Sequence, residues 1–183
     1  MSLIGESRRV LVLGLIAGVL GGYTYVTTPT KKPVTSKVAE VSERPIFTFS
    51  AEKIAQLDVS YDGKHLISKR TPEGWKSSDG ATLPSSAIDD FLVNLTKLIN
   101  LGEVEKGRDE KLSDYGLDPP VTQIALEVEG EGAQRLAIGK HNPVNTSLYA
   151  QVNQSSQIVL VGSIISWELR KLMDAIQNAA SAG

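Results

Sequence analysis

The sequence predicts a small α+β domain of mainly antiparallel β-sheet with two packed helices, preceded by one transmembrane helix. Three observations lead to this fold class. A continuous apolar run extends from Val10 to Val26. Segments that alternate apolar and polar residues, with turn residues between them, follow from about Pro45 onward, as in antiparallel strands. Two stretches, about 86–100 and 163–176, instead repeat apolar residues at three- and four-residue intervals, which is typical of amphipathic helices.

The apolar run indicates an uncleaved membrane anchor over residues 10–28. A helix of roughly 17 residues is about 25 Å long, slightly short of a hydrocarbon core near 30 Å, and the threonines that follow extend it. Arg8 and Arg9 flank its start, while Tyr23 and Tyr25 lie near its far end, where aromatic rings favour the headgroup region. A cleaved secretory signal is the alternative, but no A-x-A-like cleavage site follows the run.

Three glycines of this run, Gly14, Gly18 and Gly22, are spaced four residues apart and therefore share one face of a helix. Small residues at this spacing let a second membrane helix approach closely. The pattern predicts self-association, or docking onto a membrane-protein partner, through this glycine face. The alternative is that glycine is simply frequent in membrane spans.

These signals divide the chain into a cytoplasmic N-terminal tail (1–9), the transmembrane helix (10–28), a linker rich in Thr, Lys and Pro (29–44), a soluble α+β domain (45–177) and a polar tail (178–183). Positive charges on both flanks of the anchor partly offset each other. Because the N-terminal tail is very short, we expect it to stay in the cytoplasm, with the domain on the other side.

Composition limits the class of protein further. The net charge is −2, with 19 basic and 21 acidic residues, so the chain lacks the basic footprint of a nucleic-acid-binding protein. Cysteine is absent, which excludes disulfides, a thiolate metal site and a lipoprotein signal. We therefore expect the lipid bilayer and a membrane protein as partners, and no nucleic acid.

The first half of the domain predicts a meander of short strands that ends in a helix. The pair Asp62-Gly63 between two alternating runs is a strong hairpin signal. Ser85 or Ser86 is expected to cap the helix, and Asp89 and Asp90 to occupy its first turn, where the helix dipole favours negative charge. The strands are expected at 46–49, 57–61 and 65–70, and from Trp75 to the turn at Asp79-Gly80.

The stretch Leu112-Ser-Asp-Tyr-Gly-Leu-Asp-Pro-Pro120 predicts a tight structural corner. A single helical turn from Leu112 would end at Gly116, the residue type that tolerates a left-handed conformation. Leu117 would then return onto Leu112, and the two prolines would launch an extended chain. The corner residues are Tyr115, Gly116, Leu117, Pro119 and Pro120.

The second half repeats the order of strands followed by a helix. Ser163 is expected to cap the helix of 163–176. The sequence thus indicates two related β-β-β-α halves, at 58–99 and 124–176. Further strands are expected near 124–128, 135–138, 148–152 and 158–161.

Several of these segments together resemble a bacterial family, the domain of unknown function DUF4340. The resemblance covers about Phe47 to Ile176. It rests on YGLDPP, the alternating strand after it, LAIGK, a strand with Tyr149, QIVLV and the earlier Gly74-Trp75. It implies a bacterial inner-membrane protein with one N-terminal span and a periplasmic or otherwise extracytoplasmic domain. Some members are similar to auxiliary components encoded with ABC transporters, and the resemblance implies no catalytic residues.

No recognisable catalytic constellation appears in the sequence, so we expect no enzyme, cofactor or metal. Only His65 and His141 carry imidazoles, and neither has a nucleophile or carboxylate at a known spacing. The carboxylate pairs Asp89-Asp90 and Glu127/Glu129 are expected on solvated faces.

Two functions fit these features. The first is an accessory or scaffold subunit that presents its domain to a membrane complex. The second is an envelope module that binds a peptide, glycan or lipid at a sheet edge or loop. Trp167, His141 and Tyr149 are the candidate interaction residues. A deep pocket lined by aromatic rings would favour the second function, and a shallow apolar patch the first.

Overall fold

The computed structural model describes residues 44–181. The predicted transmembrane helix (10–28) with Gly14, Gly18 and Gly22 lies outside the described residues, as does almost all of the linker. Within residues 44–181, no helix is both long enough and apolar enough to cross a membrane.

The centre of the domain is an eight-stranded antiparallel sheet in the order β4-β3-β2-β7-β8-β9-β10-β6. A separate two-stranded ribbon joins β1 (Arg44–Pro45) to β5 (Ile99–Asn100). The strands of the large sheet are β2 (Ile54–Tyr61), β3 (Lys64–Thr71), β4 (Gly74–Ser77), β6 (Glu103–Val104), β7 (Thr122–Val128), β8 (Gly132–His141), β9 (Ser147–Val152) and β10 (Ile158–Gly162).

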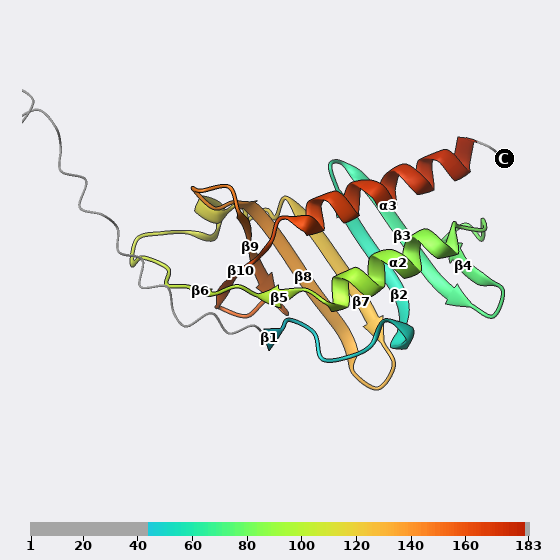
Figure 1. The fold of residues 1–183 in the computed structure, drawn as a ribbon, viewed down its shortest axis with the longest axis horizontal. Helices are drawn as coiled ribbons and strands as arrows, with labels where there is room; N and C mark the ends of the chain where they lie inside the picture. The colour runs from blue at the N-terminus through green and yellow to red at the C-terminus, as the bar shows by residue number, and fades with distance from the viewer. Residues whose placement is uncertain (1–43, 182–183) are drawn as a thin grey trace, which may run out of the picture. The chain divides into compact units, whose positions relative to one another are not determined.

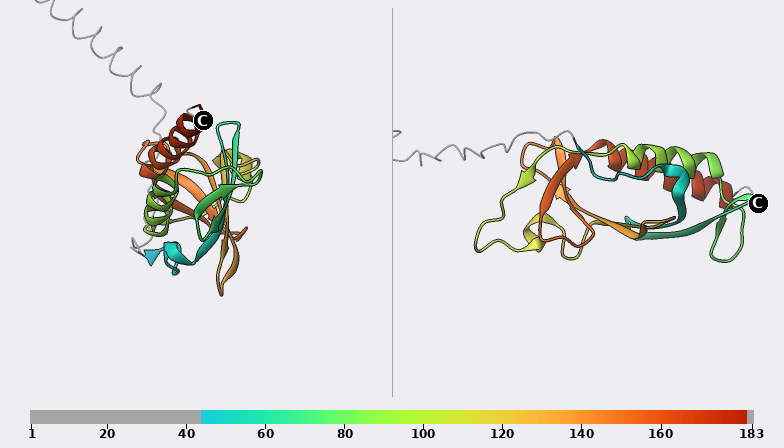
Figure 2. Two further views of the ribbon diagram at one scale, coloured as in Figure 1. Left: turned by 90° about the vertical axis from the view of Figure 1, so that its right-hand side faces the viewer. Right: turned by 90° about the horizontal axis from the view of Figure 1, so that it is seen from below.

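Two helices, α2 (Ser85–Thr96) and α3 (Ile164–Ser181), lie side by side on one face of this sheet (Figures 1 and 2). Their apolar sides and the facing strand residues form one continuous core. The fold class is therefore α+β with a mainly antiparallel sheet and two packed helices, as predicted. Central core residues from helices and strands include Phe91, Leu92, Leu95, Leu57, Ile124, Leu136 and Leu169.

The first hairpin forms where the sequence predicts it. Asp62 and Gly63, between β2 and β3, both have positive φ (49° and 71°), as a two-residue type I′ turn requires. The predicted strand at 46–49 is wrong, because this segment is irregular. Phe47 and Phe49 are nevertheless buried there, with ring centroids 5.0 Å apart, so apolar packing rather than strand pairing explains the pattern.

The first helix differs from the prediction at both ends. Its N-cap residue is Pro84, and the Ser85 hydroxyl instead accepts a hydrogen bond from the Trp75 amide at 3.0 Å. Asp89 lies beyond the first turn, as does its neighbour Asp90. The helix ends at Thr96 rather than near 100 because the next residues turn away and form β5, which pairs with β1.

The second helix is longer than predicted and lacks the predicted cap. It begins at Ile164 and continues to Ser181, past the expected end at Ile176. The Ser163 hydroxyl oxygen is buried and has no hydrogen-bond partner in the part of the chain that the structure describes, so it does not cap the helix.

The strand order bears on the prediction of two halves. From the central β2–β7 pair, β2-β3-β4 runs outward on one side and β7-β8-β9 on the other. A helix follows β4 directly, whereas the additional strand β10 precedes α3. Two related halves would both have their three strands in this outward order, as they do here. That the halves are related stays a prediction.

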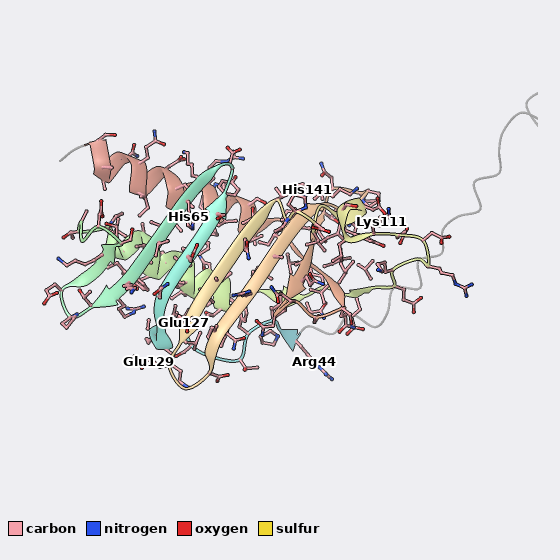
Figure 3. The ribbon with its side chains drawn as sticks, turned by 180° about the vertical axis from the view of Figure 1, so that it is seen from behind. Arg44, His65, Lys111, Glu127, Glu129 and His141 are labelled. Atoms are coloured by element: carbon pink, nitrogen blue, oxygen red, sulfur yellow. The ribbon has the colours of Figure 1, made fainter. Side chains whose placement is uncertain are left out.

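The other face of the sheet carries neither of the two long helices (Figure 3). Residues on it include the pair His65 and Asp58, whose Nε2 and Oδ1 atoms lie 2.7 Å apart. Glu127 is exposed on the same face, opposite Gln56 of β2. This face is therefore largely polar, except at the end that the LSDYGLDPP corner covers.

Candidate interaction surface

The LSDYGLDPP corner folds onto itself before β7 begins. Leu112–Tyr115 forms the 3-10 turn η2, and Gly116 follows in the left-handed conformation (φ 69°, ψ 27°). The Leu117 amide donates to the Leu112 carbonyl at 3.0 Å, which is the six-to-one bond of a Schellman motif. The Val121 amide then donates to the Gly116 carbonyl at 3.1 Å and closes the loop around the two prolines.

This corner packs against the irregular end of β8. The pairing of β8 with β9 shifts register between Ile138 and His141, at Gly139. A Cβ atom at Gly139 would collide with the carbonyl oxygen of Tyr115, and one at Gly116 would lie 2.9 Å from the Lys140 amide nitrogen. The two glycines therefore allow the backbones to touch, and the corner has a structural role.

Tyr149 belongs to this corner. Its ring meets that of Tyr115 edge to face, with centroids 4.9 Å apart and an interplanar angle of 82°. The Tyr115 hydroxyl donates to the Glu110 carboxylate. Burial, followed by this hydrogen bond, raises the pKa of Tyr115 to about 12, and burial also raises the pKa of Tyr149. The hydrogen bond from Tyr115 in turn lowers the pKa of Glu110.

The three predicted interaction residues do not form one surface. Successive strand residues point to opposite faces, and the neighbours of Tyr149, Leu148 and Ala150, belong to the core under the helices. Tyr149 thus lies on the face away from α3, which carries Trp167. His141 is exposed at the end of β8, near the corner (Figure 3).

A groove of about 350 Å³ lies between the end of α2 and the start of α3. The β5 strand contributes to its wall, because the chain turns there from α2 into the small ribbon. Asn94, Lys97 and Glu168 supply its polar groups. Its aliphatic lining consists of Leu98, Ile99, Leu101, Ile164 and Ile165.

Two large apolar side chains are exposed on α3, one in this groove and one beside it. Ile164 lines the groove and is 59% exposed, and Trp167, one turn further along the helix, is 54% exposed. Residues three apart in a helix are neighbours on its surface. The Lys171 ammonium lies 5.4 Å from the centroid of the Trp167 ring. The sequence indicates Trp167, but it gives no signal for Ile164 or for the groove.

The carboxylates considered in the sequence have structural partners or face solvent. Asp89 Oδ1 accepts a hydrogen bond from the Trp75 indole nitrogen at 3.0 Å and lies 3.1 Å from Arg70 Nη2. Asp89 is therefore part of a partly buried network with Trp75 and Arg70, and not simply a solvated residue as predicted. Among residues 44–181, no group of three His, Asp or Glu residues is arranged to hold a metal ion.

Comparison with known proteins identifies the family. No curated protein and no solved structure matches the chain. The profile of the domain of unknown function DUF4340 matches residues 77–179. The match covers the corner, Gly139 and both long helices, but it begins after Gly74-Trp75 and is thus shorter than the resemblance from Phe47 to Ile176. Because it spans more than half of the 183 residues, the chain belongs to the DUF4340 family.

Proposed function

We propose that the protein is a single-pass, membrane-anchored accessory or scaffold subunit that presents its α+β domain to a membrane complex. The observation that carries this proposal is the exposure of Ile164 and Trp167 beside the groove between α2 and α3. Apolar side chains gathered on a surface mark contact sites, and tryptophan is enriched among the residues that dominate binding. This contact would join the domain to a membrane-protein partner.

The shape of the groove favours this function over an envelope module that binds a small ligand. Among the residues that the structure describes, no aromatic side chain lines the groove, whereas drug-sized ligand sites are usually lined by aromatic side chains. An added peptide strand is also disfavoured at the outer edges. At one edge, the amide of Ser77 and the carbonyl of Trp75 in β4 bond to Ala81 and Leu83. Near the other edge, β10 pairs with the two-residue outermost strand β6, and its Leu160 bonds to Leu101 and Gly102.

The anchor and the glycine face complete the proposal. The chain would cross the bacterial inner membrane once through residues 10–28, with the domain in the periplasm, and its complex would be transporter-associated. Because the chain has no cysteine, a single cysteine at exposed Ser155 tests the orientation. It should react with a membrane-impermeant maleimide in intact spheroplasts. Labelling only after lysis would contradict the periplasmic location.

Photo-crosslinking tests the docking surface directly. A photo-reactive phenylalanine at Trp167, in the full-length chain in cells, should yield a defined adduct with a membrane protein. Val144, which is 72% exposed in the loop after β8, is the matched control position and should not yield it. The same products from both positions, or no protein adduct from Trp167, would refute the proposed contact.

Self-association through the glycine face has a separate test. Gly18→Leu should lower the oligomeric state of the full-length chain in mild detergent, or release a co-purifying membrane protein, because a large side chain keeps helices apart. If the oligomeric state and the co-purification both stay unchanged, the glycine face is not an interface.

A further inference from the structure

Glu168 is the most unusual side chain of the groove. It lies on α3 among aliphatic neighbours and is only 7% exposed. Within residues 44–181, no side-chain hydrogen bond or ion pair reaches its carboxylate. Glutamate is almost never this buried unless it has a partner, because loss of hydration disfavours its charged form.

The nearby cation does not fill this role. Lys97 also lines the groove, at the end of α2, but it is exposed and forms no ion pair with Glu168 within 4.0 Å. A lysine of this kind keeps its ammonium hydrated at the rim of the groove. The groove therefore offers an acceptor for which residues 44–181 supply no donor, beside aliphatic walls.

We infer that the groove receives a segment of the partner protein in which one lysine or arginine, flanked by aliphatic side chains, ion-pairs with Glu168. This inference rests on the proposed function and names the chemistry of the partner. The aliphatic residues of the segment would contact Ile164 and the groove wall, and its cation would supply the donor that Glu168 lacks. Such a pair discriminates strongly between partner segments with and without a basic residue. A neutral or acidic residue at that place would leave the carboxylate covered but without a partner.

Other occupants fit less well. A bound anion would face the Glu168 carboxylate at close range, which is repulsive. A divalent metal needs several oxygen ligands, and no acidic cluster of that kind occurs in residues 44–181. A small free amine would leave the aliphatic walls unused. An apolar segment with one basic residue uses both features of the groove.

A peptide selection tests the inference. Random peptides displayed on phage are selected on the full-length protein in mild detergent, and the enriched peptides are synthesised. The matched variants are Glu168→Gln, in the groove, and Glu127→Gln, which changes an exposed glutamate on the opposite face of the sheet. The near-UV circular dichroism of each variant, which reports on buried Trp75, verifies that the domain is folded.

We expect peptides with one Lys or Arg between aliphatic residues. Replacing that basic residue of the peptide with Gln should weaken its binding to the wild-type protein by at least about tenfold. The same replacement should weaken binding to the Glu168→Gln protein by less than about twofold. Glu127→Gln should behave as the wild type does. Enriched peptides without a basic residue, discrimination that persists in Glu168→Gln, or no groove-dependent peptide would overturn the inference.

The outcomes separate this inference from the proposed function. If the Trp167 crosslink to a membrane protein forms but the basic residue is dispensable, only the inference fails. If no such crosslink forms, the docking function fails whatever the peptides show. Self-association of the wild type that disappears in Glu168→Gln would identify a second copy as the occupant and would also overturn the inference.

Discussion

The carbonyl oxygen of Tyr115 lies so close to Gly139 that a Cβ atom at this glycine would collide with it. The contact joins YGLDPP and LAIGK, two separate segments on which the resemblance to the DUF4340 family rests. A corner that closes through its own hydrogen bonds thus rests on Gly139, one of the two glycines of β8, where no side chain intervenes. The two segments therefore belong to one structural unit.

Gly139→Ala should therefore destabilise the domain. The added methyl group meets backbone rather than a movable side chain, and overpacking of this kind costs about 1–3 kcal/mol. Urea unfolding of the full-length chain in detergent, followed by the fluorescence of buried Trp75, measures the loss. Gly162→Ala is the matched control, because its Cβ would lie 3.7 Å from Ile164, an ordinary contact. Equal stability of the two variants would contradict the packing described for the corner.

Asp89 should contribute to stability while its neighbour does not. Asp89→Ala removes the acceptor of the Trp75 indole, a side chain that is 1% exposed, and it also removes the carboxylate beside Arg70. A buried donor without a partner costs about 1–3 kcal/mol. Asp90 is exposed on the same helix, so Asp90→Ala should change the free energy of unfolding by less than about 0.5 kcal/mol. Similar losses in both variants would contradict a specific role of the indole contact.

Local signals in the sequence predict much of this fold. The hairpin at Asp62-Gly63 depends on two adjacent residues, and the left-handed Gly116 depends on one. Alternation predicts β7, and three- and four-residue spacing predicts the apolar sides of both helices. Such features depend on neighbours in the chain, so a single sequence contains the information that they need.

Contacts between distant segments account for the errors. Leu98 and Ile99 continue the apolar spacing of α2, but β5 forms there because β1, more than fifty residues earlier, pairs with it. Ser85 is a residue type that caps helices, yet its hydroxyl accepts a hydrogen bond from the Trp75 amide of β4 instead. The groove has the same origin, since the end of α2, β5 and the start of α3 create it only when they come together. Neither Ile164 nor Glu168 has a local sequence signal for its place there.

The stability of the wild type should fall between pH 10 and pH 12 partly because of Tyr115. Below pH 10 the hydroxyl is protonated in both the folded and the unfolded chain. Above pH 10, Tyr115 ionises in the unfolded chain but stays protonated in the folded chain, where its pKa is about 12. Ionisation therefore stabilises the unfolded state, and the free energy of unfolding falls. This change removes at most about 3 kcal/mol.

Tyr115→Phe isolates this effect. The variant lacks the hydroxyl, so its deficit relative to the wild type in urea unfolding should be largest near neutral pH and should shrink as pH rises from 10 to 12. Glu110→Gln removes the charge that faces the hydroxyl. The free energy of unfolding of this variant should therefore depend less steeply on pH, between pH 10 and pH 12, than that of the wild type. A deficit that stays constant up to pH 12 would show that the Tyr115 pKa is not raised.

Truncation of side chains on the two sides of α3 should change the free energy of unfolding by very different amounts. Leu169 is 1% exposed in the core, and Leu169→Ala should cost about 2–5 kcal/mol, because it leaves a cavity under the helix. Trp167→Ala and Ile164→Ala remove side chains that are more than half exposed, so each should change the free energy of unfolding by less than about 0.5 kcal/mol. Urea unfolding measures all three variants. A large loss at Trp167 would mean that its ring supports the fold itself. A negligible loss there, together with loss of the crosslinked adduct in Ile164→Ala, would mean that this side of α3 serves a partner and not the fold.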